Sequence, residues 1–306
     1  MLEIYGETNL DRCRLLWEQL IPPERLTDLW DVRSCFHTYF KRDPFFVVAK
    51  KNGQPVGLIP LSWIPESNCY GYFPGEVWHG KTWLEQNRLI APDQVTLLAM
   101  LHWLKKQKKN YCLRYLLENF FLSQDMSVVD EIGYLFHPKL FQYNMDNFFA
   151  QFSAKSRQGI RDEIKNFRAR NLSTRIDHLG DYDLMVAMNI ERFAQDSYFV
   201  DERFTSSFRA LMNFAKDKGW LRMTTFMVEG EPVAADMGVV YNNAYTLLAG
   251  GTHGDFPGIA KIINLHHMKR ACEQKYNEAD FLCGDFSWKK IFHLTQRPLY
   301  IVSNTN

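Results

Sequence analysis

The feature that most constrains the fold is a short internal repeat. The segments NGQPVG (52–57) and EGEPVA (229–234) share the pattern x-Gly-Gln/Glu-Pro-Val-Gly/Ala, with their glycines 177 residues apart. Each copy follows a helical pattern and lies between runs of strand-forming residues, so each is predicted to form the turn of a β-hairpin. Helix, strand, tight turn and strand therefore occur twice, which favours two related domains over an accidental match.

The second half of the chain has a continuous α/β pattern. Helices are expected at 181–196, 202–218, 257–276 and 286–294. Strands are expected at 220–229, 231–241, 244–250, 279–283 and 298–302. The first half runs similarly, with a hairpin at 45–61, a helix at 92–109 and a strand at 111–117. The sequence thus predicts an α/β fold with a mixed sheet in each half.

The charge balance of the whole chain is nearly neutral. Its 306 residues hold 36 Lys and Arg against 35 Asp and Glu, a formal net charge of +1. A dedicated nucleic-acid-binding protein usually carries a concentrated basic excess. We therefore expect no DNA partner and instead a small-molecule or protein partner.

Signals for targeting or metal binding are not found in the sequence. The start MLEIYGE is acidic, and the longest apolar runs are far shorter than the roughly 18 residues that a membrane span needs. We expect a cytoplasmic protein without a membrane span. The six cysteines form no Cys-x-x-Cys pair, and His266 and His267 should face different directions on a helix, so neither a zinc site nor a disulfide framework is predicted.

The segment 250–261 carries the strongest chemical signal. Gly250, Gly251 and Gly254 free the backbone, and Pro257 suits the first turn of a helix. Unpaired amides at such a helix start form an anion site. The run DFPGIA (255–260) also fits the end of the acyl-CoA pyrophosphate motif, Gln/Arg-x-x-Gly-x-Gly/Ala. A glycine-rich turn that only begins a helix is the alternative.

One position departs from that motif. Asp255 stands where Gln or Arg is usual, and a carboxylate beside phosphates would repel them by about 1 kcal/mol at a solvent-exposed distance. We expect Asp255 to cap the start of the helix, a position that suits its residue type. Lys261, one turn further on, is expected to supply positive charge.

A basic segment covers residues 155–170. Its cations at 157, 161, 165 and 168 fall on one face of a helix, while Ile160, Ile164 and Phe167 form the expected buried stripe. A solvated helix face is the plain interpretation. The sharper one is a phosphate contact with a nucleotide-bearing acceptor, a phosphopantetheine carrier or the donor itself.

Four short segments of the second half follow one another along the chain. They are SRQGIR (156–161), EGEPVAA (229–235), PGIA (257–260) and DFLCGD (280–285), the last followed by Lys289. With them, residues 146–302 resemble the acyltransferase domain of the GNAT superfamily. The resemblance is to the branch that contains cellulose-biosynthesis-associated acetyltransferases and bacterial Fem-type peptidyltransferases, which carry two such domains in tandem. In the first half only the hairpin and LIPL (58–61) match.

The resemblance implies two tandem GNAT-like domains, residues 1–145 and 146–306, each a mixed, mostly antiparallel sheet flanked by helices. The second would be the acyltransferase. The first has no counterpart of the pyrophosphate loop and would be structural or bind the acceptor. The donor-binding residues would be Gly250, Gly251, Gly254, Pro257, Gly258, Ile259, Ala260 and Lys261.

The implied reaction moves an acyl group from a thioester donor, acyl-CoA or an acyl carrier protein, to an amine or hydroxyl. The acceptor would be a sugar, amino acid or peptide, such as a precursor of the cell envelope or of a polysaccharide. No metal is expected. Direct transfer needs a base that takes a proton from the acceptor, and backbone amides that stabilise the oxyanion.

Three residues are candidates for that base. His253 heads the glycine-rich loop, and imidazole titrates near neutral pH. Asp285 and Asp236 are the alternatives, and Asp236 is unusual as an acid within a strand rich in Val and Ala. A hydrogen-bonding or capping role is equally open for each of the three.

Candidate substrate-binding residues come from several segments. The aromatic stretch 63–83, interleaved with glycines, is expected either to pack in the core or to grip a sugar or acyl chain, and Trp78 represents it. Tyr198 would wall the same site. The remaining candidates are Arg157 and Arg161 of the basic segment and Lys289.

Two other functions stay open. A Fem-like peptidyltransferase would use aminoacyl-tRNA, but the chain has neither a long heptad-patterned arm nor a broad basic surface. A non-catalytic GNAT-like binding protein that has lost donor binding is conceivable because of Asp255. Fold alone does not decide among these functions.

Overall fold

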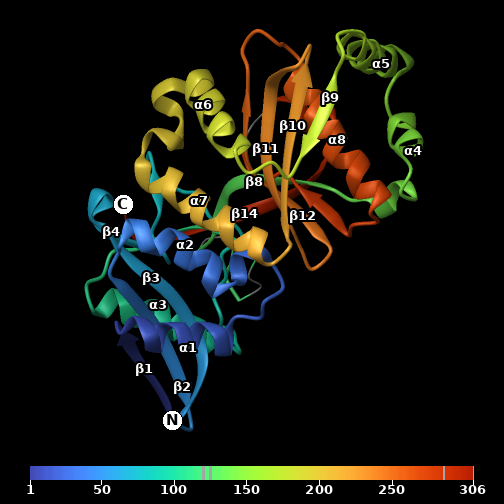
Figure 1. Cartoon of the computed structure of the whole chain (residues 1–306). Coiled ribbons are helices and arrows are strands. Elements are labelled where there is room, and N and C mark those ends of the chain that lie inside the picture. The colour runs from blue at the N-terminus through green and yellow to red at the C-terminus, as the bar shows by residue number, and fades with distance from the viewer. Residues whose placement is uncertain (119–120, 124–125, 285–286, 306) are drawn as a thin grey trace. The chain divides into compact units, whose positions relative to one another are not determined.

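The computed structural model describes residues 1–118, 121–123, 126–284 and 287–305. The chain divides into two compact units, one made of Met1–Ile132 with Arg297–Asn306 and the other of Gly133–Gln296. Each unit combines helices with a β-sheet (Figure 1), so the predicted α/β class is confirmed. Within the described residues, no helix is long and apolar enough to cross a lipid bilayer. The limits expected for the related domains, 1–145 and 146–306, stay a prediction.

The first unit is built on a four-stranded antiparallel sheet in the order β1-β2-β3-β4. Its strands are β1 (Leu2–Glu7), β2 (Pro44–Lys51), β3 (Gln54–Ile64) and β4 (Cys69–Tyr72). Its helices are α1 (Leu10–Leu20), α2 (Trp30–Phe40) and α3 (Gln94–Lys106). A parallel bridge joins Tyr70 to Tyr111, the residue before β7 (Cys112–Leu116), and β14 (Thr295–Ser303) pairs antiparallel with β7. A small ribbon of β5 (Val77–Trp78) and β6 (Lys81–Thr82) completes the unit.

The second unit contains a larger sheet in the order β8-β13-β12-β11-β10-β9. Its strands are β9 (Ser173–Ile176), β10 (Leu221–Val228), β11 (Glu231–Tyr241), β12 (Ala244–Thr252), β13 (Glu278–Asp280) and the part of β8 (Val128–Phe136) that begins at Gly133. Its helices are α4 (Met145–Ala150), α5 (Ala154–Ala169), α6 (Asp181–Phe193), α7 (Glu202–Asp217), α8 (Ile259–Glu273) and α9 (Ser287–Ile291). β12 and β13 are parallel, whereas β9 to β12 are antiparallel. The sheet is therefore mixed, with α6 on one face and α8 on the other (Figure 1).

The two units repeat one order of elements. The first has the order β1, α1, α2, β2, β3, β4, α3 and β7, with the ribbon β5-β6 inserted before α3, and the second has the order β9, α6, α7, β10, β11, β12, α8 and β13. The hairpin turns agree in backbone as well, because Asn52 and Gly53 have φ of 53° and 79°, and Glu229 and Gly230 have φ of 56° and 90°. Two consecutive left-handed residues are the geometry that joins twisted strands in a two-residue hairpin. The six-residue repeat thus marks a repeat of the whole fold.

Several element bounds differ from those expected from the sequence. The helix expected at 257–276 begins only at Ile259, because Gly258 has φ of 90° and a left-handed residue cannot continue a right-handed helix. The helix expected at 181–196 ends at Phe193, and a 3-10 turn (Ala194–Asp196) follows. β13 is shorter than the strand expected at 279–283. The four-residue β9 was not expected, since three of its four residues are exposed and show no alternating pattern.

Much of the aromatic stretch 63–83 packs in the core of the first unit. Phe73 is fully buried and stacks on Trp30 with the ring centroids 5.0 Å apart. Tyr72 is buried as well, and Trp83 stacks on Phe36 at 5.7 Å. Core packing therefore accounts for these rings, while Trp78 is half-buried and its assignment to a ligand stays a prediction.

Candidate functional site

Strands β12 and β13 separate after a short paired stretch. Their parallel pairing covers only Ala244, Tyr245 and Thr246 of β12, which continues to Thr252. The pairing of β12 with β11 skips one residue at Leu248, a β-bulge of the kind that bends a strand near functional sites. From Leu247 onward, the edge of β12 that faces away from β11 has no strand partner among the described residues. On this edge the Gly250 carbonyl accepts a hydrogen bond from Asn189, and no described strand pairs with the other backbone groups.

The loop after β12 leads to an uncapped helix start. Gly258 precedes α8 and makes no side-chain cap, and its left-handed φ of 90° suits glycine alone. The amide of Ile259 donates to the Phe256 carbonyl at 3.1 Å. Within the part of the chain that the structure describes, the amides of Gly254, Gly258 and Ala260 donate to no acceptor. Such amides at a helix start attract anions.

The glycines at the end of β12 make room for close packing. A Cβ on Gly251 would lie 2.3 Å from the Met185 carbonyl oxygen of α6, and a Cβ on Gly250 would lie 2.2 Å from Oδ1 of Asp236. Real Cβ atoms do not approach other atoms so closely, and successive strand residues face opposite sides of a sheet. Helix α6 therefore contacts β12 on one face, and the Asp236 carboxylate contacts it on the other.

Asp236 belongs to a buried polar cluster rather than to the surface. Its Oδ2 lies 2.9 Å from Nε2 of His267 on α8, and both side chains are almost fully buried. The Tyr245 ring stacks on His267 with the centroids 5.0 Å apart, and burial holds the pKa of Tyr245 well above its ordinary value. His266 faces Phe226 instead, so the two histidines do point in different directions. The bond from His267 to Asp236 was not expected from the sequence.

His253 lies at the head of the loop and is partly exposed. The backbone amide of Asp255 donates to its Nδ1 at 3.3 Å, and its ring meets Phe256 edge to face at 5.7 Å. An imidazole nitrogen that accepts a hydrogen bond carries the lone pair of the neutral ring. The expectation that Asp255 caps the helix is wrong, because its side chain is 88% exposed and α8 has no side-chain cap.

Lys261 and helix α5 meet through an ion pair. The ammonium of Lys261 lies 2.6 Å from both carboxylate oxygens of Glu163. Phe167 of α5 packs with Ile259 of α8 in one apolar cluster. The start of α8 is therefore fixed against α5, and the charge of Lys261 is shared with a carboxylate that the sequence analysis did not assign to the site.

The cations of α5 lie on another side of that helix. Arg157 is half-buried, and Arg161, Lys165 and Arg168 are exposed. Among the described residues, none of these four has a carboxylate partner within 4.0 Å. Their face is open to an anionic partner.

The remaining candidates are more scattered. Lys289 is 2% exposed, and its ammonium donates to the carbonyls of Phe281, Leu282 and Cys283 at 2.7 to 3.0 Å. Its described contacts are those of a structural lysine that holds the turn after β13. Asp285 lies outside the described residues. Tyr198, in the 3-10 turn Tyr198–Val200, stacks on Phe208 of α7 at 5.5 Å.

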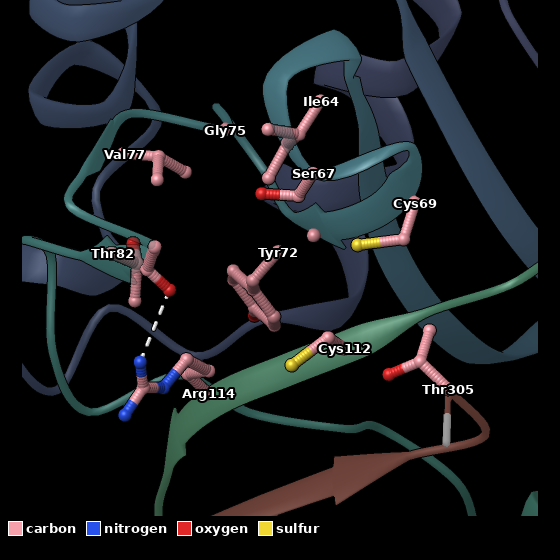
Figure 2. A pocket seen from close by; sticks show the side chains of 12 residues that line it. Ile64, Ser67, Cys69, Tyr72, Gly75, Val77, Thr82, Cys112, Arg114 and Thr305 are labelled. Carbon is pink, nitrogen blue, oxygen red and sulfur yellow. Dashed lines mark hydrogen bonds between the residues drawn. The ribbon is translucent and has the colours of Figure 1, made fainter.

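A cavity of about 300 Å³ lies within the first unit (Figure 2). Small and polar side chains surround it, among them the hydroxyls of Ser67 and Thr82 and the thiols of Cys69 and Cys112. Arg114 is its charged group and pairs with Asp130, with Nε 2.9 Å from Oδ2. Trp78 neighbours the lining residue Val77 in the sequence but does not itself line the cavity.

The structure thus gathers the residues of 250–261 and Asp236 at one end of β12, whereas Trp78 belongs to the other unit. Sequence reasoning missed Glu163, His267 and Asn189. Asn189 carried a usable signal, since it is a polar residue on the buried face of α6 beside Met185 and Met188. The partners of Glu163 and His267 depend on how α5, α8 and β11 pack, which no local pattern reveals.

Comparisons with known proteins agree with this architecture. Residues 154–290 match the family model described as acetyltransferase (GNAT) domain. No curated protein matches the sequence. The match covers α5 to α9, which includes the unpaired edge of β12 and the loop before α8.

Three solved structures share the fold over nearly the whole chain. A conserved protein of unknown function from Bacteroides thetaiotaomicron VPI-5482 is 17% identical, with 99% of each chain covered and a TM-score of 0.60. FemX is 11% identical, with 98% of this chain and 96% of that chain covered and a TM-score of 0.57. A tandem GNAT protein from the clavulanic acid biosynthesis pathway is 12% identical, with 100% and 99% covered and a TM-score of 0.54. At these identities the likeness is one of fold, and the predicted tandem GNAT-like architecture is confirmed.

Proposed function

We propose that this protein, which carries a GNAT domain at residues 154–290 within the fold of tandem GNAT proteins, transfers an acyl group from a thioester donor to an amine or hydroxyl. The observation that carries the proposal has two parts, both inside the matched domain. Strand β12 has an edge without a described strand partner, and helix α8 begins without a side-chain cap. Catalysis is assigned to the second unit on this ground.

The donor's phosphates would be bound by the helix start. The free amides of Gly254, Gly258 and Ala260 are three donors within seven residues of the loop and helix start, and the helix dipole adds partial positive charge. Gly258 and Ala260 carry little or no side chain that would keep phosphate away. Gly250, Gly251, Pro257 and Ile259 would shape this loop, and the unpartnered edge of β12 would hold the extended arm of acyl-CoA by backbone hydrogen bonds.

Lys261 contributes to donor binding less directly. Its ammonium already contacts both oxygens of Glu163, so its charge is partly neutralised in the free protein. A phosphate bound at the helix start would compete with Glu163 for this cation. The exposed Asp255 adds repulsion, which an exposed side chain relieves by turning towards solvent.

The reaction exchanges a thioester for an amide or ester. The acceptor nitrogen or oxygen bonds to the acyl carbon and loses a proton to the base, the carbon–sulfur bond breaks, and the thiolate leaves and takes up a proton. We assign the base to His253, the most accessible of the described candidates at the end of β12. It would act through Nδ1, which must exchange the long contact with the Asp255 amide for the acceptor's proton.

The acceptor is proposed to be a small amine or alcohol of a sugar, amino acid or peptide, of the kind found in precursors of the cell envelope. Tyr198 is the candidate acceptor contact in the second unit. The first unit is proposed to be structural or to bind the acceptor, with Trp78 and the cavity beside the 64–82 segment as the supporting features. Lys289 has its described contacts to backbone carbonyls, so a substrate role for it would require these bonds to break.

One observation favours a second donor class. The unpartnered cations of α5 suit an anionic macromolecule, either an acyl carrier protein or an aminoacyl-tRNA as in a Fem-like peptidyltransferase, and FemX shares the fold. An Arg157→Ala/Arg161→Ala double variant should then lose turnover with the macromolecular donor while keeping its affinity for CoA.

The test of the main proposal is direct binding and turnover. Calorimetry with a panel of acyl-CoAs should show binding at micromolar concentrations, and thermal unfolding should shift upward by mass action. Release of free thiol in the presence of candidate amines and alcohols would identify the acceptor. If no acyl-CoA produces heat, a thermal shift or thiol release, the CoA-dependent function is wrong. A positive result with acyl carrier protein or aminoacyl-tRNA would then support the second donor class.

A further inference from the structure

A chain of buried hydrogen bonds ends on the backbone of Gly250. The Nδ2 amide of Asn189 in α6 donates to the Gly250 carbonyl oxygen at 2.7 Å. The Ser197 hydroxyl donates to Asn189 Oδ1 at 2.7 Å, and the amide of Phe199 donates to Ser197 Oγ at 3.2 Å. Asn189 is 5% exposed and Ser197 is 1% exposed. Since Ser197 also accepts from Phe199, its proton goes to Asn189, and this fixes which end of the Asn189 amide faces Gly250.

The hydrogen bond from Asn189 shows which edge of β12 the backbone groups of Gly250 face. A strand residue points its N–H and its C=O towards the same neighbour, and in an antiparallel pair a residue either exchanges both bonds with its opposite residue or neither. Gly250 lies opposite Asp236 of β11, yet its carbonyl bonds to Asn189. Its N–H therefore also points away from β11, towards the unpartnered edge of β12.

Packing fixes Gly250 from both faces of the sheet. On one face, the neighbouring Gly251 lets α6 approach so closely that a Cβ on Gly251 would lie 3.0 Å from the backbone nitrogen of Asn189. On the other, the Asp236 carboxylate fills the place of a Gly250 side chain and is held by His267. The backbone of Gly250, held in this way, has little freedom to rotate.

We infer that Asn189 is a positioning residue for acyl transfer: by holding the Gly250 carbonyl it aims the Gly250 N–H at the carbonyl oxygen of the bound thioester. Ser197 orients Asn189 in turn. This inference rests on the proposed function and deepens it, because it assigns the residues that aim the oxyanion-stabilising amide. Asn189 touches neither donor nor acceptor.

The direction of the Gly250 N–H matters because of the charge that develops during acyl transfer. When the acceptor attacks, the thioester oxygen gains negative charge, and a preorganised N–H stabilises this charge far more than the ground-state carbonyl. Without Asn189 the Gly250 carbonyl is no longer held, so the φ and ψ angles of Gly250 can change, and its N–H on the other side of the Cα would be misplaced but still present. We expect kcat to fall at least tenfold, with the Kd of CoA changed less than threefold, because the phosphate-binding amides before α8 are untouched.

The experiment uses the full chain and acetyl-CoA, with two substitutions at the positioning residue. Asn189→Asp keeps the shape and replaces the donor by a carboxylate oxygen, and Asn189→Leu removes both polar groups. The readouts are kcat from thiol release, the Kd of CoA from calorimetry, and the NMR shift of the Gly250 amide when acetyl-CoA is added. In the wild type this amide should move downfield, and in both variants the movement should shrink.

Serine variants provide the matched control. Ser197→Ala should reduce kcat severalfold at constant Kd. Ser207→Ala removes an equally buried hydroxyl, which donates to the Arg203 carbonyl within α7, and should leave both constants unchanged. A purely structural role for Asn189 predicts instead lower thermal stability with equal losses for the Ser197 and Ser207 variants.

The possible failures can be told apart. If wild-type protein binds acetyl-CoA but the Gly250 amide does not respond, or if both Asn189 variants retain kcat, the positioning role is wrong and the proposed function stands. If wild-type protein binds no acetyl-CoA, the CoA-dependent function fails, and the role assigned to Asn189 fails with it.

Discussion

Helices α3 and α8 hold the same place in the order of elements of the two units, yet they begin in opposite ways. α3 follows Asp93, whose carboxylate accepts a hydrogen bond from the amide of Thr96 at 2.7 Å. This bond is the main reason why the pKa of Asp93 lies below its ordinary value. α8 follows Gly258, which offers no side chain, and the nearby amides of Gly258 and Ala260 have no acceptor among the described residues.

The difference shows how a repeated fold acquires a site in only one copy. In the first unit the helix start is neutralised by a carboxylate of the chain itself, and residues 73–93 separate the preceding strand from the helix. In the second unit only residues 253–258 separate them, no carboxylate of the described residues caps the helix, and we propose that an anion of the donor takes this place. A helix start that lacks its own anion is an anion site.

The largest expected effect concerns the proposed catalytic base, which lies in the second unit only. His253→Gln removes the proposed base and should lower kcat about 100-fold or more, with the Kd of CoA unchanged. His102→Gln, an exposed histidine on α3, is the matched control and should have no effect. Retained activity in the His253 variant, measured by thiol release, would remove this residue from the mechanism.

The half-buried His266 of α8 should make stability depend on pH. Burial is the main cause that lowers the pKa of His266 from 6.5 to about 4, and the neighbouring His267 adds to it. Between pH 6.5 and 4 this residue is protonated in the unfolded chain but stays neutral in the folded chain. The free energy of unfolding therefore falls as the pH falls towards 4. The contribution is about 3 kcal/mol over this range.

His266→Gln should remove that contribution. Urea unfolding at pH 4 and at pH 6.5 should then show a smaller difference for the variant than for the wild type. Equal pH dependence in both proteins would mean that His266 is not the group responsible. His102→Gln, at an exposed position of α3, is the control substitution.

A smaller effect is expected when the cap of α3 is removed. Asp93→Ala deletes the bond to the Thr96 amide and should lower the thermal unfolding midpoint by about 3 °C. Calorimetric binding of CoA should be unchanged, since the first unit is not assigned to donor binding. If the variant instead altered CoA affinity, the assignment of the donor to the second unit alone would have to be abandoned.

The smallest effect concerns the ion pair beside the open helix start. Glu163→Gln frees the charge of Lys261 and should tighten CoA binding about threefold at low salt, an effect that 0.5 M salt should largely abolish. Lys261→Met should weaken binding by a similar factor. Two variants with the same change in affinity would show that the pair acts through structure and not through charge.

Local sequence patterns predicted the fold well where local chemistry decides it. The hairpins at 52–57 and 229–234 could be predicted because glycine, preceded by asparagine in the first copy, favours the left-handed turn that twisted strands require. The position where α8 begins could not, because the pattern around Pro257 suits a helix, and only the backbone shows that Gly258 is left-handed. A single residue's φ angle therefore decided both the helix start and the expected role of Asp255.

The candidate site was predictable in outline but not in its connections. The glycines of 250–258 marked the loop, because close packing requires glycine at 250 and 251 and a left-handed backbone requires it at 258. The partners Asp236 with His267, and Glu163 with Lys261, are 31 and 98 residues apart in the sequence. Such pairs depend on how helices pack on the sheet, and the sequence of a single chain contains no local signal for that packing.

The central claim is that the start of α8 is open to a ligand's phosphates, as the start of α3 is not. The most direct measurement is calorimetric titration of CoA into two variants of equal size, Ala260→Asp and Ala260→Asn. A carboxylate at this position should supply the anion that α8 lacks and weaken CoA binding about 100-fold, while the neutral amide should change it little. Equal affinity of the two variants for CoA would contradict the account.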